Sequence, residues 1–493
     1  MWLGLDGKDA LYLQVYRALR QAILEGRLPP GDRLPATRAL ARELGLSRNV
    51  VLLAYDQLYA EGYVEGRVGA GTFVAPELPE TLLEAPRPPS HASTPAAPRF
   101  SEFGKRALAL DPAARRRGTP PPEAHLVYDF QYGELAPDGR ILNQWRRLLG
   151  RLAVDLDLNY APAAGRPRLR KELAEYVRRN RGITCEPDQV VVVNGSQQAL
   201  TLATRLLLDP GDRVLIEDPH YQGARQIFLA AGAELVRGPV DSEGLCLEDA
   251  PVEAETARLA YVTPSHQFPS GAVLPLARRL ELLEWADRAD AYIVEDDYDS
   301  EYRYEGRPVE AVYGLDQRGR TLYVGTLSKV LFPALRLGFM VLPEPLVQPF
   351  TAAKWLADRQ SPSLEQEVLA QLIADGHFES HLRRMRSQNS RRRQALLEAL
   401  DRDLGSGVEI TGTNAGVHLL VWLNDLAPER TDELVVRAAE EGIGLYSIAP
   451  YFLEAPPRAG LLMGYASLEP DEIQQGVARL GRVLGELTRR VSR

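Results

Sequence analysis

Cysteine and long apolar runs are scarce in this chain of 493 residues. Cys185 and Cys246 are the only cysteines, and they form no CxxC motif and no cluster with histidine. This scarcity argues against a disulfide framework and a zinc site, so no metal is expected, and it fits a reducing cytoplasm. No run of about 18 apolar residues and no apolar leader segment is present, so we expect a cytoplasmic protein with no membrane partner.

Basic residues are fewer than acidic ones, and the formal net charge is −9. Taken alone, this charge would argue against nucleic-acid binding. Residues 1–75, however, hold nine Lys and Arg against eight Asp and Glu, a net charge of +1, which leaves −10 for the remainder. The acidity therefore belongs to the later part of the chain and does not exclude DNA binding by the first part. The length itself predicts two or more domains.

A segment rich in proline and alanine follows the first 75 residues. Residues 76–99 show no hydrophobic period, and a second cluster of glycine and proline lies at 118–122, after Arg115, Arg116 and Arg117. We interpret residues 76–125 as a semi-rigid linker that becomes partly ordered toward its end. The predicted domains are therefore residues 1–75 and 126–493. The three arginines are interpreted as a solvated run, with phosphate contact as the alternative.

The first 75 residues predict three short helices and a hairpin. Apolar residues recur at every fourth position from Leu11 to Ile23, which predicts the first helix. A second helix over 37–44 is stopped by a glycine, and Ser47 can cap the third. Two helices joined by a tight turn are typical of the helix-turn-helix motif. Residues 63–74 alternate around three glycines and predict a small hairpin, or wing.

The exposed start of the third predicted helix carries groups suited to base edges in a major groove. A three-helix scaffold that binds nothing is the alternative, but the order and spacing of the elements and the placement of the arginines favour DNA. Residues 9–75 resemble the winged-helix domain of GntR-type bacterial regulators. The DNA contacts that this resemblance implies are Arg38, Ser47, Arg48, Asn49 and, in the wing, Arg67.

From about residue 125, β-rich runs alternate with helical stretches, which predicts an α/β fold with a mainly parallel sheet. Five of these runs end in polar residues, and they are 189–193, 213–217, 258–262, 291–295 and 321–324. In open α/β sheets, ligands bind beyond the carboxyl ends of the strands. The five polar ends are therefore expected to converge on one site.

The strand ends suit the phosphate of pyridoxal 5′-phosphate (PLP). A phosphate favours backbone N–H groups at the start of a helix, where the helix dipole attracts anions. Gly195, Ser196 and Gln197 supply such groups, and Thr326 and Arg336 add a hydroxyl and a guanidinium.

Other strand ends suit the PLP ring and its aldehyde. Asp296 can keep the pyridine nitrogen protonated, Tyr298 can reach the phenolic oxygen, and Tyr221 can stack on the ring. Lys329 can form a Schiff base, because desolvation by its apolar neighbours is expected to lower its pKa. Taken alone, Lys329 would be interpreted as a surface lysine. The order of all these motifs together favours the cofactor.

That order resembles the fold-type-I aminotransferases. The winged helix, the linker and this domain, with TPSHQFPSG at 263–271 and EDDYDSEYRY at 295–304, closely resemble the MocR/GabR-type transcriptional regulators over nearly the whole chain. The resemblance implies PLP bound to Lys329, a homodimer, and transcriptional control through a small effector. It also implies that Tyr160 reaches the phosphate of the partner subunit.

Three departures from related patterns bear on the effector. Aminotransferases usually have Asn-Pro-Thr-Gly where this chain has Phe268-Pro269-Ser270-Gly271, so His266 or Gln267 is expected to replace the asparagine at the ring oxygen. Leu462 lies where those enzymes place the arginine that binds the substrate carboxylate. Gly223 lies where the GABA-responsive branch has an arginine.

We therefore predict a PLP-dependent regulator that binds double-stranded operator DNA and senses PLP itself, reporting vitamin B6 status, or an amino compound. The alternative is a catalytically active aminotransferase with an appended DNA-binding domain. Leu462 weighs against that alternative, because a bidentate arginine gives the orientation that catalysis needs. A domain that only dimerises is least favoured, since Lys329, Asp296, Tyr298 and Arg336 are all present.

Overall fold

The computed structural model describes residues 9–67, 69–79, 98–110, 118–136, 138–154, 157, 159–305 and 310–489. The chain forms two compact units, Met1–Arg99 and Phe100–Arg493. Half of the predicted linker, residues 80–97 and 111–117 with the three arginines at 115–117, lies outside the described residues. Within the described ranges, no helix is long and apolar enough to span a bilayer.

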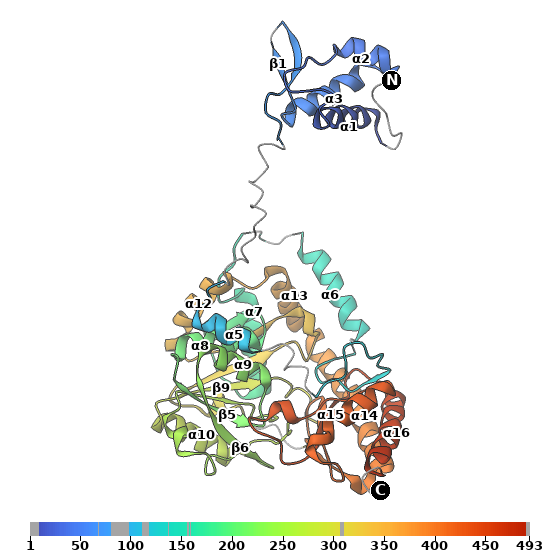
Figure 1. Cartoon of the computed structure of the whole chain (residues 1–493). Coiled ribbons are helices and arrows are strands. Elements are labelled where there is room, and N and C mark those ends of the chain that lie inside the picture. The colour runs from blue at the N-terminus through green and yellow to red at the C-terminus, as the bar shows by residue number, and fades with distance from the viewer. Residues whose placement is uncertain are drawn as a thin grey trace. The chain divides into compact units, whose positions relative to one another are not determined.

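The first unit is a winged helix-turn-helix (Figure 1). Its elements are α1 (Leu11–Leu24), α2 (Thr37–Leu44), α3 (Arg48–Ala60), β1 (Val64–Arg67) and β2 (Gly71–Val74). Gly45, with a φ of 67°, makes the turn after α2, because a left-handed backbone conformation strains other residues. The Ser47 hydroxyl accepts from the Val50 N–H at 3.4 Å and caps α3. The helices pack on one apolar core, and β1 pairs with β2 in an antiparallel hairpin, as predicted.

The second unit contains an eight-stranded, mostly parallel sheet. Its strands are β4 (Val190–Val193), β5 (Arg213–Asp218), β6 (Glu234–Asp241), β7 (Gly244–Leu245), β8 (Leu259–Val262), β9 (Tyr292–Asp297), β10 (Thr321–Thr326) and β11 (Gly338–Val341). The spatial order is β4-β11-β10-β9-β8-β5-β6-β7, and only β11 and β7 run antiparallel to their neighbours. The five predicted strands are all present and parallel to one another, so their carboxyl ends lie at one edge.

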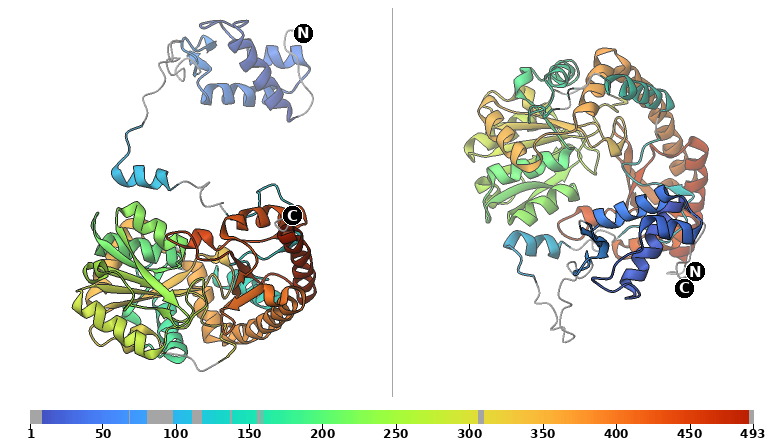
Figure 2. Two further views of the ribbon diagram at one scale, coloured as in Figure 1. Left: turned by 60° about the horizontal axis from the view of Figure 1, so that its bottom comes forward. Right: turned by 90° about the horizontal axis from the view of Figure 1, so that it is seen from above.

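Helices cover both faces of this sheet (Figure 2). One face packs on α8 (Ser196–Leu207), α9 (Gln222–Ala231) and α12 (Glu344–Asp358). The other face packs on α7 (Pro167–Arg181), α10 (Leu276–Arg288) and α13 (Ser363–Ala374). Strands buried on both sides explain the nearly continuous apolar runs in the sequence.

A smaller lobe follows, coloured orange to red in Figure 2. Its elements are β3 (Tyr128–Asp129), α14 (His377–Leu404), β12 (Val408–Thr411), β13 (His418–Leu423), α15 (Thr431–Glu440), β14 (Ile443–Gly444), β15 (Gly460–Gly464) and α16 (Pro470–Arg489). Strands β12, β13 and β15 form an antiparallel sheet, and β3 from early in the chain pairs with β14. The helices α6 (Gly139–Leu152) and α11 (Val312–Leu315) complete the unit.

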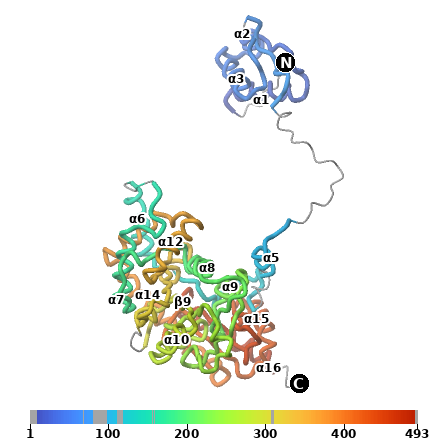
Figure 3. Tube along the Cα trace, turned by 90° about the vertical axis from the view of Figure 1, so that its left-hand side faces the viewer, coloured from blue at the N-terminus to red at the C-terminus, as the bar shows by residue number. Residues whose placement is uncertain are grey.

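A helix also lies inside the range that was predicted to be linker. This helix, α5 (Glu102–Ala109), is capped by Ser101 and lies beside α9 (Figure 3). Its Arg106 guanidinium donates to the carbonyl oxygens of Ala230 and Ala231, at 2.9 and 3.1 Å. Ordered structure therefore begins earlier than residue 126, at the start of the second unit.

Candidate functional site

A cavity of about 150 Å³ opens at the carboxyl ends of β4, β8, β9 and β10. Its lining residues are Tyr132, Ser196, Gln197, Tyr221, Tyr261, Thr263, Phe268, Asp296, Tyr298, Thr326, Ser328, Lys329, Pro333 and Arg336. All the residues predicted for the cofactor are among them except Gly195 and Tyr160. The predicted convergence of separate strand ends therefore occurs in the folded chain.

One end of the cavity is arranged to receive an anion. Gly195, with a φ of 79°, precedes the first turn of α8, so the N–H groups of Ser196 and Gln197 belong to a helix N-terminus. The Arg336 guanidinium donates to the Asn194 carbonyl at 3.0 Å. A Cβ at position 195 would lie 3.0 Å from an Arg336 nitrogen, so glycine lets the cation approach the helix start. A phosphate here would meet N–H groups, a helix dipole and a guanidinium together.

Asp296 also lines the cavity, and its side chain is almost fully buried. Its Oδ2 accepts from the Tyr261 hydroxyl at 2.8 Å, while Oδ1 has no partner in the described part of the chain. Burial raises the pKa of Asp296 to about 7, because the ionised form loses its hydration. A cationic N–H donor, such as a pyridinium, would supply the missing partner and stabilise the carboxylate.

Tyr221, immediately before α9, lines the same cavity. Its hydroxyl accepts from the Gln197 amide at 3.1 Å, which fixes the ring. A Cβ on Gly223 would lie 2.6 Å from the Tyr221 ring. Glycine at position 223 therefore makes room for the aromatic ring, and a longer side chain here would displace it.

Lys329 reaches the cavity from the loop that follows β10. Its neighbours Leu327, Val330 and Leu331 are buried, as the sequence predicted. Burial lowers the pKa of Lys329, and the Asp299 carboxylate partly opposes this shift. The ammonium lies 4.6 Å from the centre of the Tyr132 ring. A lysine with a lowered pKa is neutral more often, which favours attack on a carbonyl.

The structure distinguishes the two residues expected to replace the missing asparagine. The Gln267 amide donates to Glu217 and to the carbonyls of Pro219 and Phe268, so it points away from Tyr298. His266 instead lies with its Nδ1 2.9 Å from the Tyr298 hydroxyl.

Leu462 is fully buried on β15, opposite Leu420 on β13. It packs in an apolar cluster with Phe268, Tyr298 and Ile448, beside the cavity. Among the described residues, Lys329 and Arg336 are the only cationic side chains that line this cavity. Neither Leu462 nor Gly223 therefore offers a charge that could bind a substrate carboxylate.

Tyr160 lies outside the cavity, and 87% of its surface is exposed. It is not among the described residues that line the cavity of its own chain. Tyr132 and Tyr261 line the cavity but were not predicted from the sequence. No motif marks Tyr132, and Tyr261 lies within a buried strand, where an aromatic residue is ordinary.

The predicted DNA contacts all lie on the first unit. Arg38 on α2, and Ser47, Arg48 and Asn49 at the start of α3, are all exposed. Arg67 on β1 is also exposed, but its guanidinium pairs with Glu65 at 2.7 Å and lies over the Phe73 ring. Arg38 and Arg48 have no ion-pair partner within the described ranges.

Comparisons with known proteins agree with the winged helix of the first unit and with the α/β fold of the second. Residues 11–74 match the gntR family of bacterial regulatory proteins, and residues 130–480 match the aminotransferase class I and II family. The chain is 40% identical to a probable rhizopine catabolism regulatory protein, MocR, from Rhizobium meliloti, over 97% of this chain and 94% of the relative. It is 29% identical to the pyridoxine biosynthesis regulator PdxR of Corynebacterium glutamicum, over 95% and 94% of the two chains.

The second unit also resembles solved aminotransferases. The α-aminoadipate aminotransferase LysN of Thermus thermophilus, complexed with a phosphopyridoxyl-leucine, superposes with a TM-score of 0.68 at 30% identity. The match covers 78% of this chain and 97% of that enzyme. An orphaned carboxylate oxygen, an anion-binding helix start and a desolvated lysine fit the same cofactor. The chain therefore belongs to the MocR-type regulators, in which a GntR-type DNA-binding domain is joined to an aminotransferase-like domain that binds PLP.

Proposed function

We propose that this regulator responds to PLP, or to an amine captured by PLP, at the cavity that contains Lys329. The observation that carries the proposal is the convergence of Lys329, the free Asp296 Oδ1 and the start of α8 on one cavity. When bound, PLP supplies an electron-withdrawing ring and an aldehyde that captures amines. In this proposal Lys329 holds the aldehyde carbon, and Asp296 holds the ring nitrogen and its proton.

The remaining contacts follow from the same geometry. The N–H groups of Ser196 and Gln197, the Thr326 hydroxyl and the Arg336 guanidinium bind the phosphate, with Gly195 giving them room. Tyr221 stacks on the ring, and Tyr298 donates to the phenolic oxygen. In this arrangement the Arg336 guanidinium is occupied by the phosphate and is not left to bind a substrate carboxylate.

The apolar cluster around Leu462 favours a sensing role over catalytic turnover. Transamination needs the substrate held while its Cα–H bond aligns with the ring, and a bidentate arginine ordinarily does this. The apolar cluster around Leu462 and the glycine at 223 leave that role unfilled. An active aminotransferase with a DNA-binding appendage is the second candidate, supported by the likeness to LysN.

We further propose that the regulator is a homodimer. Two observations on Tyr160 support this: its position matches the tyrosine that reaches the partner's phosphate in the MocR/GabR-type pattern, and its side chain is exposed and outside the cavity of its own chain. In the dimer, Tyr160 of one protomer reaches the phosphate bound by the other. The predicted DNA contacts, Arg38, Ser47, Arg48, Asn49 and Arg67, then occur twice, which suits an operator with two half-sites.

The test measures binding of the full-length protein to DNA that it selects from its own genome, with and without PLP. We expect PLP to change this affinity at least severalfold in the wild type and to leave Lys329→Ala unaffected. DNA affinity that is indifferent to PLP alone, but altered once an amine is added, would move the effector role to the amine. Indifference to both would contradict the proposal.

A further inference from the structure

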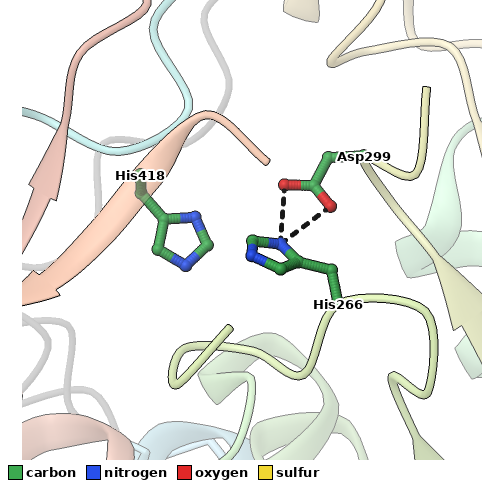
Figure 4. Close-up of side chains that lie close together, drawn as sticks. All are labelled: His266, Asp299 and His418. Carbon is green, nitrogen blue, oxygen red and sulfur yellow. Dashed lines mark hydrogen bonds and ion pairs between the residues drawn. The ribbon is translucent and has the colours of Figure 1, made fainter. Parts of the chain in front are cut away.

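A buried histidine and a buried aspartate lie behind Tyr298, on the side away from the cavity. His266 Nδ1 is 3.1 Å from both carboxylate oxygens of Asp299 (Figure 4). The same nitrogen is 2.9 Å from the Tyr298 hydroxyl. Both side chains are at most 1% exposed. The proposed contacts of the cofactor do not include either residue, although a buried polar pair is expensive to desolvate unless it is well satisfied.

Close packing holds this pair in place. A Cβ on Gly416 would lie 2.6 Å from His266 Nδ1 and 2.7 Å from an Asp299 oxygen. Gly416, with a φ of 81°, therefore allows the chain to pass against both side chains. The imidazole orientation is thus fixed by contacts on the backbone side as well as by the carboxylate.

A metal ion is the first alternative for this cluster, because His418 lies next to His266 (Figure 4). His266 Nδ1 is already bonded to Asp299, and His418 Nε2 lies 3.2 Å from the Pro269 carbonyl. This leaves one free nitrogen on each ring among the described residues, fewer than the three or four protein ligands of an ordinary zinc site.

The hydrogen-bond geometry has a simpler consequence. An ionised Asp299 only accepts hydrogen bonds, so it holds the proton of His266 on Nδ1. The same N–H faces the Tyr298 oxygen, which then accepts rather than donates. The Tyr298 hydroxyl proton is thereby left to point toward the cavity, where PLP would present its phenolic oxygen.

We propose that His266, oriented by Asp299, is a positioning residue that makes Tyr298 the hydrogen-bond donor to the phenolic oxygen of PLP. It thereby replaces, through Tyr298, the asparagine that aminotransferases place at this oxygen. The proposal rests on PLP binding at Lys329 and is independent of whether PLP or an amine is the effector.

The proposal predicts a change in the pH dependence of the bound cofactor. Donation from Tyr298 stabilises negative charge on the phenolic oxygen and so lowers the pKa of the Lys329 nitrogen joined to PLP. Weaker donation raises the pH midpoint of the PLP absorbance change. The other ionisable groups near the pair are Asp296, Asp297, Lys329 and His418, with the tyrosines Tyr132, Tyr302, Tyr304 and Tyr465.

Most of these groups keep one charge state across the range. Burial raises the pKa values of Tyr132, Tyr302 and Tyr304 well above 10 and lowers that of His418 well below 6.5. Asp297 is held ionised by Arg181, which lowers its pKa against the effect of burial. Asp296 titrates nearby but is common to every variant compared, so its contribution cancels.

The experiment is a pH titration of the PLP absorbance in four full-length holo-proteins: wild type, His266→Leu, Tyr298→Phe and the double variant. A hydrogen bond of ordinary strength is worth about one pH unit, so we expect His266→Leu to raise the midpoint by about that amount. Tyr298→Phe raises it at least as much, and the double variant equals Tyr298→Phe, because His266 acts through Tyr298. His266→Asn, which keeps a donor near the position of Nδ1, recovers part of the shift.

Two results would overturn the proposal. An unchanged midpoint in folded His266→Leu would leave His266 as packing alone. If His266→Leu shifted the midpoint of Tyr298→Phe as much as it shifts the midpoint of the wild type, His266 would act on PLP directly. Where His266→Leu does not fold, the nearly isosteric Asp299→Asn serves instead, and we expect a shift in the same direction that is also absent without Tyr298. If no PLP were found on Lys329, the proposed function would fail, and this outcome is distinct from a failure of the role proposed for His266.

Discussion

The Tyr261 hydroxyl donates to Asp296 Oδ2 at 2.8 Å, and the second carboxylate oxygen is left unsatisfied within the described residues. Burial raises the pKa of Asp296 to about 7, so the folded protein without PLP holds a proton that the unfolded chain releases near pH 4. The unfolded state therefore binds fewer protons over this range. The contribution of Asp296 to the free energy of unfolding therefore falls as the pH rises from about 4 to 7.

Between pH 4 and 7 we expect the free energy of unfolding of Asp296→Asn to fall by up to about 4 kcal/mol less than that of the wild type. Denaturant unfolding of PLP-free protein at several pH values measures this difference. Glu217 and Glu295, whose pKa values are also raised to about 7, remain in both proteins and leave a residual slope. Asp188→Asn is the matched control, since that side chain is 94% exposed. Identical pH slopes for wild type and Asp296→Asn would contradict a buried, proton-binding Asp296.

The same substitution tests the cofactor contact. A hydrogen bond to a charged partner is worth about 1.5–3 kcal/mol, so Asp296→Asn should weaken PLP binding by roughly tenfold to a hundredfold. Titration of PLP-free protein with PLP, followed by absorbance, measures this change. Wild-type affinity in the variant would place the ring nitrogen elsewhere.

Reduction with borohydride should fix PLP on Lys329. Lys354 in the second unit is fully buried, and its ammonium is held by Asp358, Ser361 and Gln198. Peptide mapping should therefore find the label on Lys329 and none on Lys354, and Lys329→Ala should show no trapped cofactor. A label that persists in Lys329→Ala would identify a different attachment site.

Arg48 should carry part of the sequence-specific DNA affinity. It is exposed at the start of α3, where a recognition helix presents side chains to base edges. Arg48→Ala should cost about 1–3 kcal/mol of specific binding at fixed salt, with little change in thermal stability. Arg27→Ala is the control, because Arg27 pairs with Glu25 near the end of α1. Equal losses for both variants would indicate a general charge effect.

Common amino acids should be turned over at least a hundredfold more slowly than the ~10 s⁻¹ ordinary for enzymes. The reason is the uncharged wall, in which Leu462 packs on Phe268 and Leu420 and offers no group to hold a carboxylate. Keto-acid production by holo-protein over an amino-acid panel measures this rate. Several turnovers per second on any of them would favour the aminotransferase alternative.

Much of the cavity could be predicted because parallel strands place their carboxyl ends at one edge. Lys329, Asp296 and the start of α8 follow strands directly, so local sequence positions them. Tyr132 could not be predicted, because it approaches Lys329 from a distant segment whose path depends on how the smaller lobe packs. The choice between His266 and Gln267 likewise required the structure, since the sequence periodicity does not specify the directions in which adjacent loop residues point.

The helix α5 was also beyond prediction, because its proline-rich surroundings are typical of a linker and its partner α9 is far away in sequence. Arg106 joins the two by donating to the Ala230 and Ala231 carbonyls at the end of α9. The other end of α9 begins directly after Tyr221, which lines the cavity. A rigid helix thus connects the cofactor cavity to the segment that leads toward the DNA-binding domain.

Arg106→Ala should therefore weaken the response of DNA affinity to PLP while leaving PLP affinity itself within about twofold. Coupling between two sites is typically about 1–3 kcal/mol, and we expect the variant to lose most of it. DNA binding is measured with and without PLP, and PLP binding is titrated separately. Lys105→Ala is the matched control, since its exposed ammonium pairs with Glu102 on the same helix. A full PLP response in Arg106→Ala would show that the contact between α5 and α9 supports the fold but does not transmit the state of the cavity.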